Sequence, residues 1–284
     1  MAEQIKIKSG KLSALINFRG AELTSFFDGE REVIWQGDER FWTSHAPVLF
    51  PVCGGLKDDA YYYNGKKYNM IKHGYVRKTD FSLFESTENS ATFVLFDDKN
   101  SKEIYPFEFK LFIKYTLSDH LEVEYKVQNQ GKTDMYFTIG AHEGFALDDE
   151  FSNYSVTFEV EEDLKALTLY GSLIGDEYTD MGKVKELKLS YDYFAIDALV
   201  FKDIKSKALT LKHKDKGEVM RICSDDNFKH LLLWTKPNAP YICIEPWVAL
   251  PDRVDSNQNI EQKPDVIKLA AGESKSFIHA IKGR

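Results

Sequence analysis

Hydrophobic and polar residues alternate along much of this chain with a period of two. Every second residue from Phe107 to Tyr115 is apolar, and the same holds from Leu121 to Val127. Successive side chains of a β-strand point to opposite faces, so each run predicts a strand with one buried and one exposed face. Residues 118–120 join the two runs as a short loop. The pair is therefore typical of an antiparallel hairpin.

Turn-forming dipeptides indicate further hairpins. Asn64-Gly65 separates two short runs rich in tyrosine and lysine, and this dipeptide readily takes the positive φ angles of a type I′ turn. Asp28-Gly29 lies between the runs 23–27 and 32–35, and Gln130-Gly131 follows the second strand of the first hairpin. Shorter runs that predict strands are 92–96, 135–139, 208–212, 231–235, 241–245 and 276–281.

Helical periodicity is nearly absent from the chain. Residues 38–43 and 186–193 are the best candidates for short helices. Many strands joined by hairpins, with almost no helix, predict an all-β sandwich or barrel. No linker, low-complexity tract or fixed-period repeat interrupts the pattern, so we expect one domain over residues 1–284.

Charge and composition narrow the class of protein. The net charge is −8 and the basic residues are scattered, which argues against a nucleic-acid partner. No run is long and apolar enough for a membrane helix, and the N-terminus has no apolar signal region. Cys53, Cys223 and Cys243 are widely spaced and form no CxxC pair. These features predict a cytoplasmic protein with reduced thiols and without a zinc site or a membrane partner.

Two histidines have suggestive neighbours. His73 precedes Gly74, and His142 lies between Gly140 and Gly144. A glycine lets the backbone approach a ligand closely or adopt angles that other residues avoid. Two interpretations remain open for each position. The histidine either binds a ligand or is hydrogen-bonded in a tight turn.

Glu245 is the most distinctive carboxylate. It ends the apolar run that begins at Tyr241 and precedes Pro246-Trp247. Partial burial disfavours the charged form, which raises a carboxyl pKa toward the range useful to a general base. We expect Pro246 to stop strand pairing and Trp247 to offer a flat face on which a sugar stacks. The alternative is a glutamate that simply reaches water at a strand end.

Asp197 stands alone in the apolar stretch 193–201. It is a candidate for holding a hydroxyl-rich ligand or for closing a turn. The nucleotide-binding, serine-hydrolase and zinc-protease motifs that would indicate other chemistry are absent from the sequence.

Together these segments resemble the aldose 1-epimerase (galactose mutarotase-like) superfamily, and in particular its LacX-like branch. The matching stretches occur in the family's order and are 34–38, 42–55, 73–77, 139–142, 194–201 and 244–247.

The resemblance implies a large antiparallel β-supersandwich and an enzyme that interconverts the α and β anomers of a hexose. It implies Glu245 as the general base and His142 as the general acid, with His73 and Arg77 lining the sugar site. Asp197 would match the family's hydroxyl-binding acid. The implied partner is a monosaccharide such as galactose, and no metal or organic cofactor is expected. Proton transfer of this kind suits a glutamate that accepts and a histidine that is kept cationic.

The sequence departs from the family pattern at two places. Glu143 stands where relatives often have proline, and we expect its carboxylate to change the pKa of the neighbouring His142. Residues 53–56 lack the arginine that relatives often carry there. Its absence weakens a sugar-phosphate interpretation, because phosphate binding favours arginine forks.

Three other functions remain open alongside the aldose 1-epimerase. The first is a hexose-6-phosphate mutarotase, which needs Lys72, Arg77 or other cations to converge on a phosphate. The second is a carbohydrate-binding protein without catalysis. The third is a glycoside hydrolase or lyase, which needs a second carboxylate such as Asp197 or Glu143. The identity of the hexose and a homodimeric state are also left open.

Overall fold

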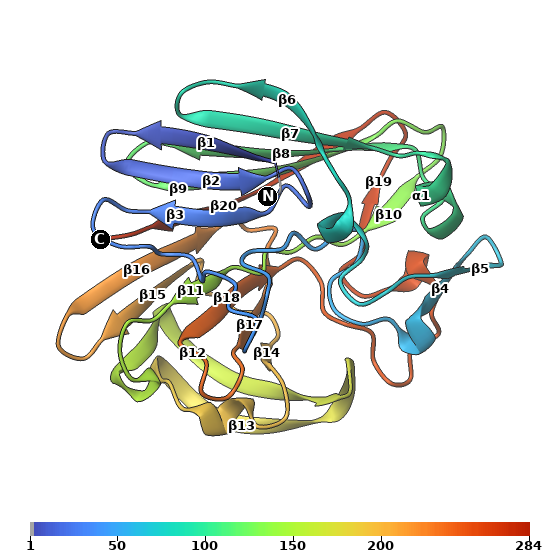
Figure 1. Ribbon diagram of the computed structural model, residues 1–284. Helices are drawn as coiled ribbons and strands as arrows, with labels where there is room; N and C mark the ends of the chain where they lie inside the picture. Colours follow the sequence, from blue (N-terminus) through green and yellow to red (C-terminus); the bar gives the residue numbers. More distant parts are fainter. Residues whose placement is uncertain (1–2) are drawn as a thin grey trace.

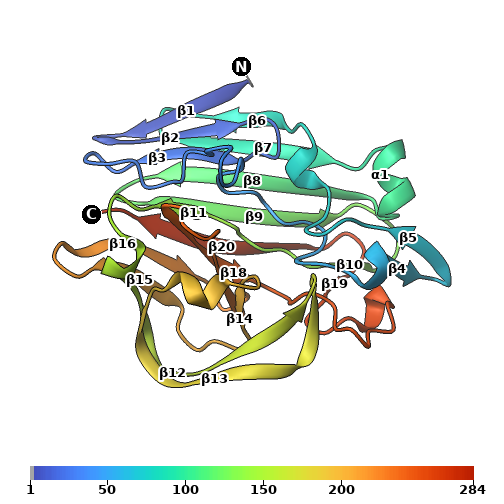
Figure 2. The same cartoon turned by 60° about the horizontal axis from the view of Figure 1, so that its bottom comes forward.

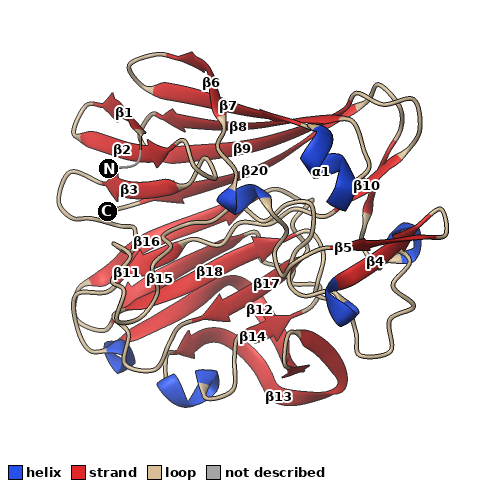
Figure 3. Cartoon of the chain, turned by 45° about the vertical axis from the view of Figure 1, so that its right-hand side comes forward, coloured by secondary structure: helices blue, strands red, loops and turns tan. Residues whose placement is uncertain are grey.

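Strands dominate the computed structural model, which describes residues 3–284 (Figure 1). The strands are β1 (Gln4–Ser9), β2 (Leu12–Asn17), β3 (Leu23–Phe27), β4 (Ala60–Tyr63), β5 (Lys66–Asn69), β6 (Ser82–Ser86), β7 (Ser90–Phe96), β8 (Phe109–Leu117), β9 (Leu121–Asn129), β10 (Met135–Phe137), β11 (Gly144–Ala146), β12 (Tyr154–Tyr170), β13 (Leu173–Lys188), β14 (Leu199–Phe201), β15 (Ala208–His213), β16 (Gly217–Ser224), β17 (His230–Trp234), β18 (Tyr241–Trp247), β19 (Ile267–Leu269) and β20 (Ser274–Lys282). The helices are α1 (Lys99–Ile104) and the 3₁₀ turns η1 (Lys57–Asp59), η2 (Val76–Lys78), η3 (Phe151–Asn153), η4 (Tyr191–Phe194) and η5 (Ile260–Gln262). Figure 3 shows these helices as short pieces between strands, so the prediction of an all-β fold is confirmed.

One large antiparallel sheet organises the molecule. Its thirteen strands follow the order β11-β18-β17-β14-β12-β15-β16-β20-β9-β8-β7-β6, with β13 paired to β12 beside this path. Strands β1, β2 and β3 form a separate sheet that packs on β7 and β8. Strands β12 and β13 make a long curved hairpin at the opposite end of the molecule (Figure 2). The strands of the candidate site lie between these two ends.

The period-two pattern of the sequence is reproduced in the burial of β8 and β9. Alternate side chains of both strands are buried, and the strands pair in register from Phe109 with Asn129 to Leu117 with Leu121. The hairpin predicted at 118–120 is therefore confirmed. The buried face packs into the main apolar core, which also contains side chains of the N-terminal sheet. Burial of this apolar face is the main stabilising contribution.

The predicted turns are confirmed to different degrees. Asn64 and Gly65 have φ angles of 48° and 72° and connect β4 to β5, as a type I′ turn requires. The turn at Asp28-Gly29 also forms, but residues 32–35 make isolated bridges, from Glu32 to Phe27 and from Ile34 to Phe145, and not a strand. The six shorter strand predictions correspond to β7, β10, β15, β17, β18 and β20.

Both helix predictions were wrong. Residues 38–43 form turns, because the Asp38 carboxylate accepts a hydrogen bond from the Arg40 backbone N–H and holds the chain in a local turn. Residues 186–188 belong to β13, where pairing with β12 overrides local helix propensity. Only η4 remains of the second predicted helix. The short helix α1 was missed, although Asp98 and Ser101 form its capping box.

The prediction that Pro246 stops strand pairing was also wrong. Strand β18 continues to Trp247, and Pro246 lies opposite Leu231 of β17. A proline loses only its N–H donor, and the Pro246 carbonyl still accepts a hydrogen bond from the Ala141 backbone N–H at 3.1 Å. Glu245 therefore lies inside a strand and not at its end.

Within residues 3–284, no helix has both the length and the apolar character needed to cross a membrane.

Candidate active site

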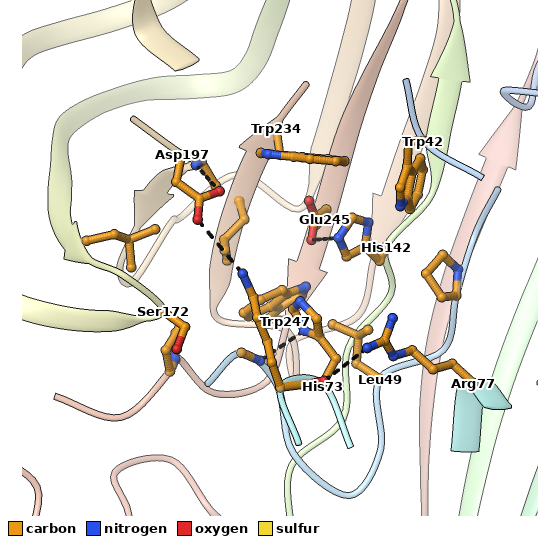
Figure 4. Close-up of a pocket in the computed structure, with 17 residues that line it drawn as sticks. Trp42, Leu49, His73, Arg77, His142, Ser172, Asp197, Trp234, Glu245 and Trp247 are labelled. Carbon is orange, nitrogen blue, oxygen red and sulfur yellow. Dashed lines mark hydrogen bonds and ion pairs between the residues drawn. The ribbon is translucent and has the colours of Figure 1, made fainter. Parts of the chain in front are cut away.

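A cavity of about 250 Å³ opens where β17 and β18 meet loops from the first half of the chain (Figure 4). Its walls are contributed by segments that range from Trp42 to Pro251. All six site residues expected from the sequence line it, namely His73, Arg77, His142, Asp197, Glu245 and Trp247. The fold thus brings together residues that are widely separated along the chain.

Glu245 and His142 face one another at the centre of this cavity. Glu245 points inward from β18, where it lies opposite Leu232 of β17, and only 2% of its side chain is exposed. His142 lies two residues before β11, which pairs with β18, so the two side chains are held next to each other by neighbouring strands. The distance from His142 Nε2 to Glu245 Oε2 is 3.4 Å (Figure 4). A carboxyl group and an imidazole are therefore positioned to act on adjacent atoms of one ligand.

Burial shifts the proton affinity of both groups. Desolvation raises the pKa of Glu245 well above its ordinary value, and the nearby Lys72 ammonium opposes this effect. Desolvation also lowers the pKa of His142 to about 3. The expectation that His142 is kept cationic is therefore wrong for the unliganded protein, because burial favours the neutral imidazole. The Glu245 carboxylate is therefore a stronger base than an exposed carboxylate. A protonated His142 ring is likewise a stronger acid than an imidazolium in water.

His73 is fixed by its backbone and by one ring nitrogen. The residue has a φ of 70°, and its Nδ1 accepts a hydrogen bond from the Gly54 backbone N–H at 3.1 Å. The neutral ring consequently carries its proton on Nε2, and burial lowers its pKa well below the ordinary value. The next residue must be glycine, because a Cβ on Gly74 would lie 2.0 Å from the Phe50 carbonyl oxygen. His73 is thus a neutral hydrogen-bond donor beside the Glu245–His142 pair.

Trp247 forms an apolar wall of the cavity. Its indole N–H donates to the Ala141 carbonyl at 3.1 Å, and the His73 ring meets it edge to face at 5.5 Å. Gly140 permits this packing, since a Cβ there would lie 2.7 Å from the indole. The glycine that suggested a ligand site in the sequence therefore makes room for Trp247.

Charged groups surround the rest of the cavity. Lys72 Nζ lies 3.8 Å from an Asp197 carboxylate oxygen, and the other Asp197 oxygen accepts from the Ala198 backbone N–H. Arg77 donates to the Lys72 carbonyl at 3.3 Å, while its buried Nε has no hydrogen-bond partner among the described residues 3–284. Burial lowers the Arg77 pKa, with Glu22 opposing the effect. Arg77 and Lys72 thus retain donors for a polar ligand.

Three further lining residues were not singled out by sequence reasoning. Trp42 packs against the His142 ring in a tilted arrangement with centroids 5.1 Å apart, and Trp234 of β17 meets the same ring edge to face at 5.9 Å. Trp42 lies in a stretch that matches the family, and Trp234 lies in a predicted strand. The sequence did not indicate that either side chain contacts His142. Ser172 reaches the cavity from the tip of the β12–β13 hairpin, for which the sequence offers no signal.

Glu143 does not act on His142 as expected. Its side chain is buried outside the cavity, where Oε1 lies 2.7 Å from Nε2 of the equally buried His279. Consecutive residues of an extended chain point to opposite sides, so Glu143 turns away while His142 faces the cavity. Glu143 is therefore unsuited to be the second carboxylate of a glycosidase, although its charge contributes to the raised pKa of Glu245.

Loss of the buried Glu143–His279 contact is expected to destabilise the protein. Removing one member of a buried pair leaves the other polar group without its partner, which typically costs about 3–5 kcal/mol. We therefore expect Glu143→Ala to lower the free energy of unfolding in urea by this amount. Glu108→Ala is the control, because Glu108 is exposed and pairs with Lys102 at the surface. Its expected loss is below about 1 kcal/mol, and equal losses in the two variants would contradict the prediction.

One group of potential metal ligands lies at the site. Atoms of His142, Cys243 and Glu245 all lie within 4.8 Å of one another. Burial raises the pKa of the Cys243 thiol well above its ordinary value, which disfavours the thiolate form that binds metals. The expectation that no metal or cofactor is needed stays a prediction.

Comparison with known proteins identifies the family of this chain. Residues 3–282 match the family model described as aldose 1-epimerase. The chain belongs to the aldose 1-epimerase family, which supports a carbohydrate mutarotase type of function and implies a monosaccharide ligand.

Within this family the chain groups with the LacX-like proteins. It is 33% identical to the plasmid-encoded protein LacX of Lactococcus lactis subsp. lactis, over 93% of this chain and 94% of the relative. Two solved structures are 28% identical with TM-scores of 0.92, and each match covers 99% of this chain. They are a galactose mutarotase related enzyme from Lactobacillus acidophilus, of which 97% is covered, and a galactose mutarotase-like protein from Lactobacillus casei, of which 100% is covered. The predicted galactose mutarotase-like fold is thereby confirmed.

Proposed function

We propose that this chain is an aldose 1-epimerase that interconverts the α and β anomers of a hexose such as glucose or galactose. The observation that carries the proposal is the contact between Glu245 and His142 in a cavity lined by Trp247. Ring opening needs one group that accepts a proton from the C1 hydroxyl and one that donates a proton to the ring oxygen, and both of these oxygens are bonded to C1.

The proposed reaction requires only proton transfer. Glu245 removes the proton from the C1 hydroxyl, and the electrons of that O–H bond form the carbonyl at C1. The C1–O5 bond breaks, its electron pair moves to O5, and His142 supplies a proton there. The open-chain aldehyde rotates about C1–C2, and the two groups exchange roles as the ring closes on the other face. The pair therefore holds one proton in total, and although burial favours that proton on Glu245 in the unliganded protein, it must lie on His142 when the sugar reacts.

The surrounding residues would bind and polarise the sugar. His73, as a neutral donor, and Arg77 are placed to stabilise negative charge that develops on oxygen. Asp197 would accept hydrogen bonds from sugar hydroxyls, and Trp247 would contact the apolar face of the ring. A cytoplasmic location is part of the proposal and agrees with three cysteines that are all unpaired.

Polarimetry tests the proposed activity directly. Freshly dissolved α-glucose or α-galactose should approach its equilibrium rotation faster when the protein is added, in proportion to protein concentration. Sugar binding without any acceleration would contradict the enzyme and indicate a carbohydrate-binding protein. Release of reducing sugar from an oligosaccharide would instead indicate a glycoside hydrolase.

A hexose 6-phosphate is a second candidate substrate. It is favoured by the Nε of Arg77, which has no hydrogen-bond partner within residues 3–284, and by Lys72, which also lines the cavity. Rates on glucose and on glucose 6-phosphate under the same conditions distinguish the two candidates. A higher kcat/KM for the phosphorylated sugar, lost in Arg77→Ala, would select the second.

The pH profile should reflect the proton held by the pair. Because burial lowers the pKa of His142 to about 3 from its ordinary value of 6.5, kcat/KM should stay level as the pH falls through 6.5. We expect kcat/KM to decline only at lower pH, where a second proton binds to the Glu245–His142 pair. On the alkaline side, activity should fall once the pH passes the raised pKa of Glu245 and the only proton is lost. Rates corrected for spontaneous anomerisation measure this profile, and an acidic limb centred near pH 6.5 would contradict it.

A further inference from the structure

A second cavity, of about 650 Å³, adjoins the candidate sugar site. Its lining comes from β12 near residues 166–169, from β13 and from the segment 192–199. The two cavities share the lining residues Leu169, Asp197 and Ala198. The proposed anomerisation of a monosaccharide uses only the smaller cavity and assigns no role to the larger one.

The lining of this second cavity suits a sugar. Tyr193 and Ile196 line it and are exposed to 40% and 85%, so this wall presents apolar surface to solvent. The lining also carries charged side chains, among them Asp180 and Lys188 of β13 and Asp192 of η4. Apolar surface combined with a few polar groups is typical of small-molecule sites of this volume. An aromatic ring offers its face to C–H groups, while carboxylates accept from hydroxyls.

The proposed chemistry fixes how a sugar lies between the two cavities. The C1 hydroxyl must face Glu245 and the ring oxygen must face His142, so the ring edge from C1 to O5 points at the pair. Figure 4 shows Asp197 toward the Glu245 side of the pair and Arg77 toward the His142 side. The C2 and C3 positions follow C1 around the ring, on the side away from O5. They therefore face Asp197, which borders the second cavity, while C5 and C6 face Arg77.

We propose that the second cavity binds a second sugar unit, so that the chain acts on reducing disaccharides that are linked through O2 or O3 of the reducing-end residue. This inference rests on the proposed function, because that function sets the orientation of the first sugar. A unit linked through O6 would point away from the second cavity.

Two disaccharides of glucose with the same anomeric linkage test the proposal. Laminaribiose is linked β1→3 and gentiobiose β1→6. We expect kcat/KM for anomerisation of laminaribiose to exceed that of gentiobiose by about fivefold, the effect of one additional aromatic contact. Equilibrium binding measured by calorimetry should show the same preference. Tyr193→Ala should abolish the preference and leave the rate on glucose unchanged.

Tyr178→Ala is the matched control. Tyr178 is a tyrosine of β13 with 51% exposure, and it lines neither cavity. It should keep the preference for laminaribiose. Equal kcat/KM values for the two disaccharides in the unmodified protein would overturn the proposal, as would an unchanged preference in Tyr193→Ala.

Binding separates this proposal from the proposed function. If no sugar is anomerised but laminaribiose binds more tightly than gentiobiose in a Tyr193-dependent way, the second sugar site stands and the enzymatic function fails. If glucose is anomerised and the two disaccharides behave alike, the function stands and the second sugar site fails. If none of the three sugars binds, both are overturned.

Discussion

Replacement of Glu245 by glutamine is expected to lower kcat for anomerisation by about 10²-fold or more. Glutamine keeps the size of the side chain and its ability to accept a hydrogen bond, but it cannot take up the proton of the C1 hydroxyl. Burial of the native carboxyl also raises its pKa, so the variant loses a base that is stronger than an exposed carboxylate. The loss should appear in kcat and kcat/KM together, because the interaction is made in the transition state.

The measurement for Glu245→Gln is polarimetry at saturating and at low sugar concentration. Thermal unfolding of the variant establishes that the fold is retained. Glu124→Gln is the matched control, because Glu124 is a glutamate of β9 in the same sheet and lies outside the cavity. It should keep the native rate. A Glu245→Gln protein with a near-native rate would remove this residue from the mechanism.

Replacement of His142 by asparagine is expected to have a comparable effect, again about 10²-fold or more. Asparagine retains a polar group at the site but cannot deliver a proton to the ring oxygen. Because the two residues act as one proton-transfer pair, the double variant should be little worse than the slower single variant. This non-additivity distinguishes a shared chemical step from two independent structural losses.

Sugar binding must be measured alongside the rate of His142→Asn. Calorimetry should show affinity within about tenfold of the native protein, since His73, Arg77 and Asp197 still line the cavity. His120→Asn serves as the control, because His120 lies in the surface loop between β8 and β9. Multiplicative losses in the double variant, or a native rate in His142→Asn, would refute the paired role.

The sequence predicted those strands in which the pattern of hydrophobic and polar residues matches the burial of the side chains in the folded protein. Strands β8 and β9 have one face in the core and one outside it, so the alternation from Phe109 to Asn129 was sufficient to find them. The β12–β13 hairpin escaped notice because much of β13 is exposed and its pairing contains bulges, which break any simple alternation. Residues 186–188 show the same limit, since their strand conformation is imposed by β12.

The candidate site was predictable only where a residue's neighbours in the chain carried the signal. Glu245 was found because an apolar strand surrounds it, and His142 because glycines flank it. The contacts of Trp42 and Trp234 with the His142 ring join segments far apart in sequence, so no local pattern indicated them. Their packing against the imidazole completes its burial, and this burial lowers the pKa of His142 and favours the neutral ring.

The assembly of the cavity from distant segments has a consequence for refolding. Trp42, His142, Ser172, Glu245 and Pro251 reach it from separate parts of the chain, and contacts between such distant residues form late and slowly. Partly refolded molecules that contain the early hairpins should therefore be inert toward sugars. Recovery of catalysis after dilution from denaturant should lag behind recovery of the β-sheet circular dichroism signal. Catalytic activity would then report the last step in formation of the native state.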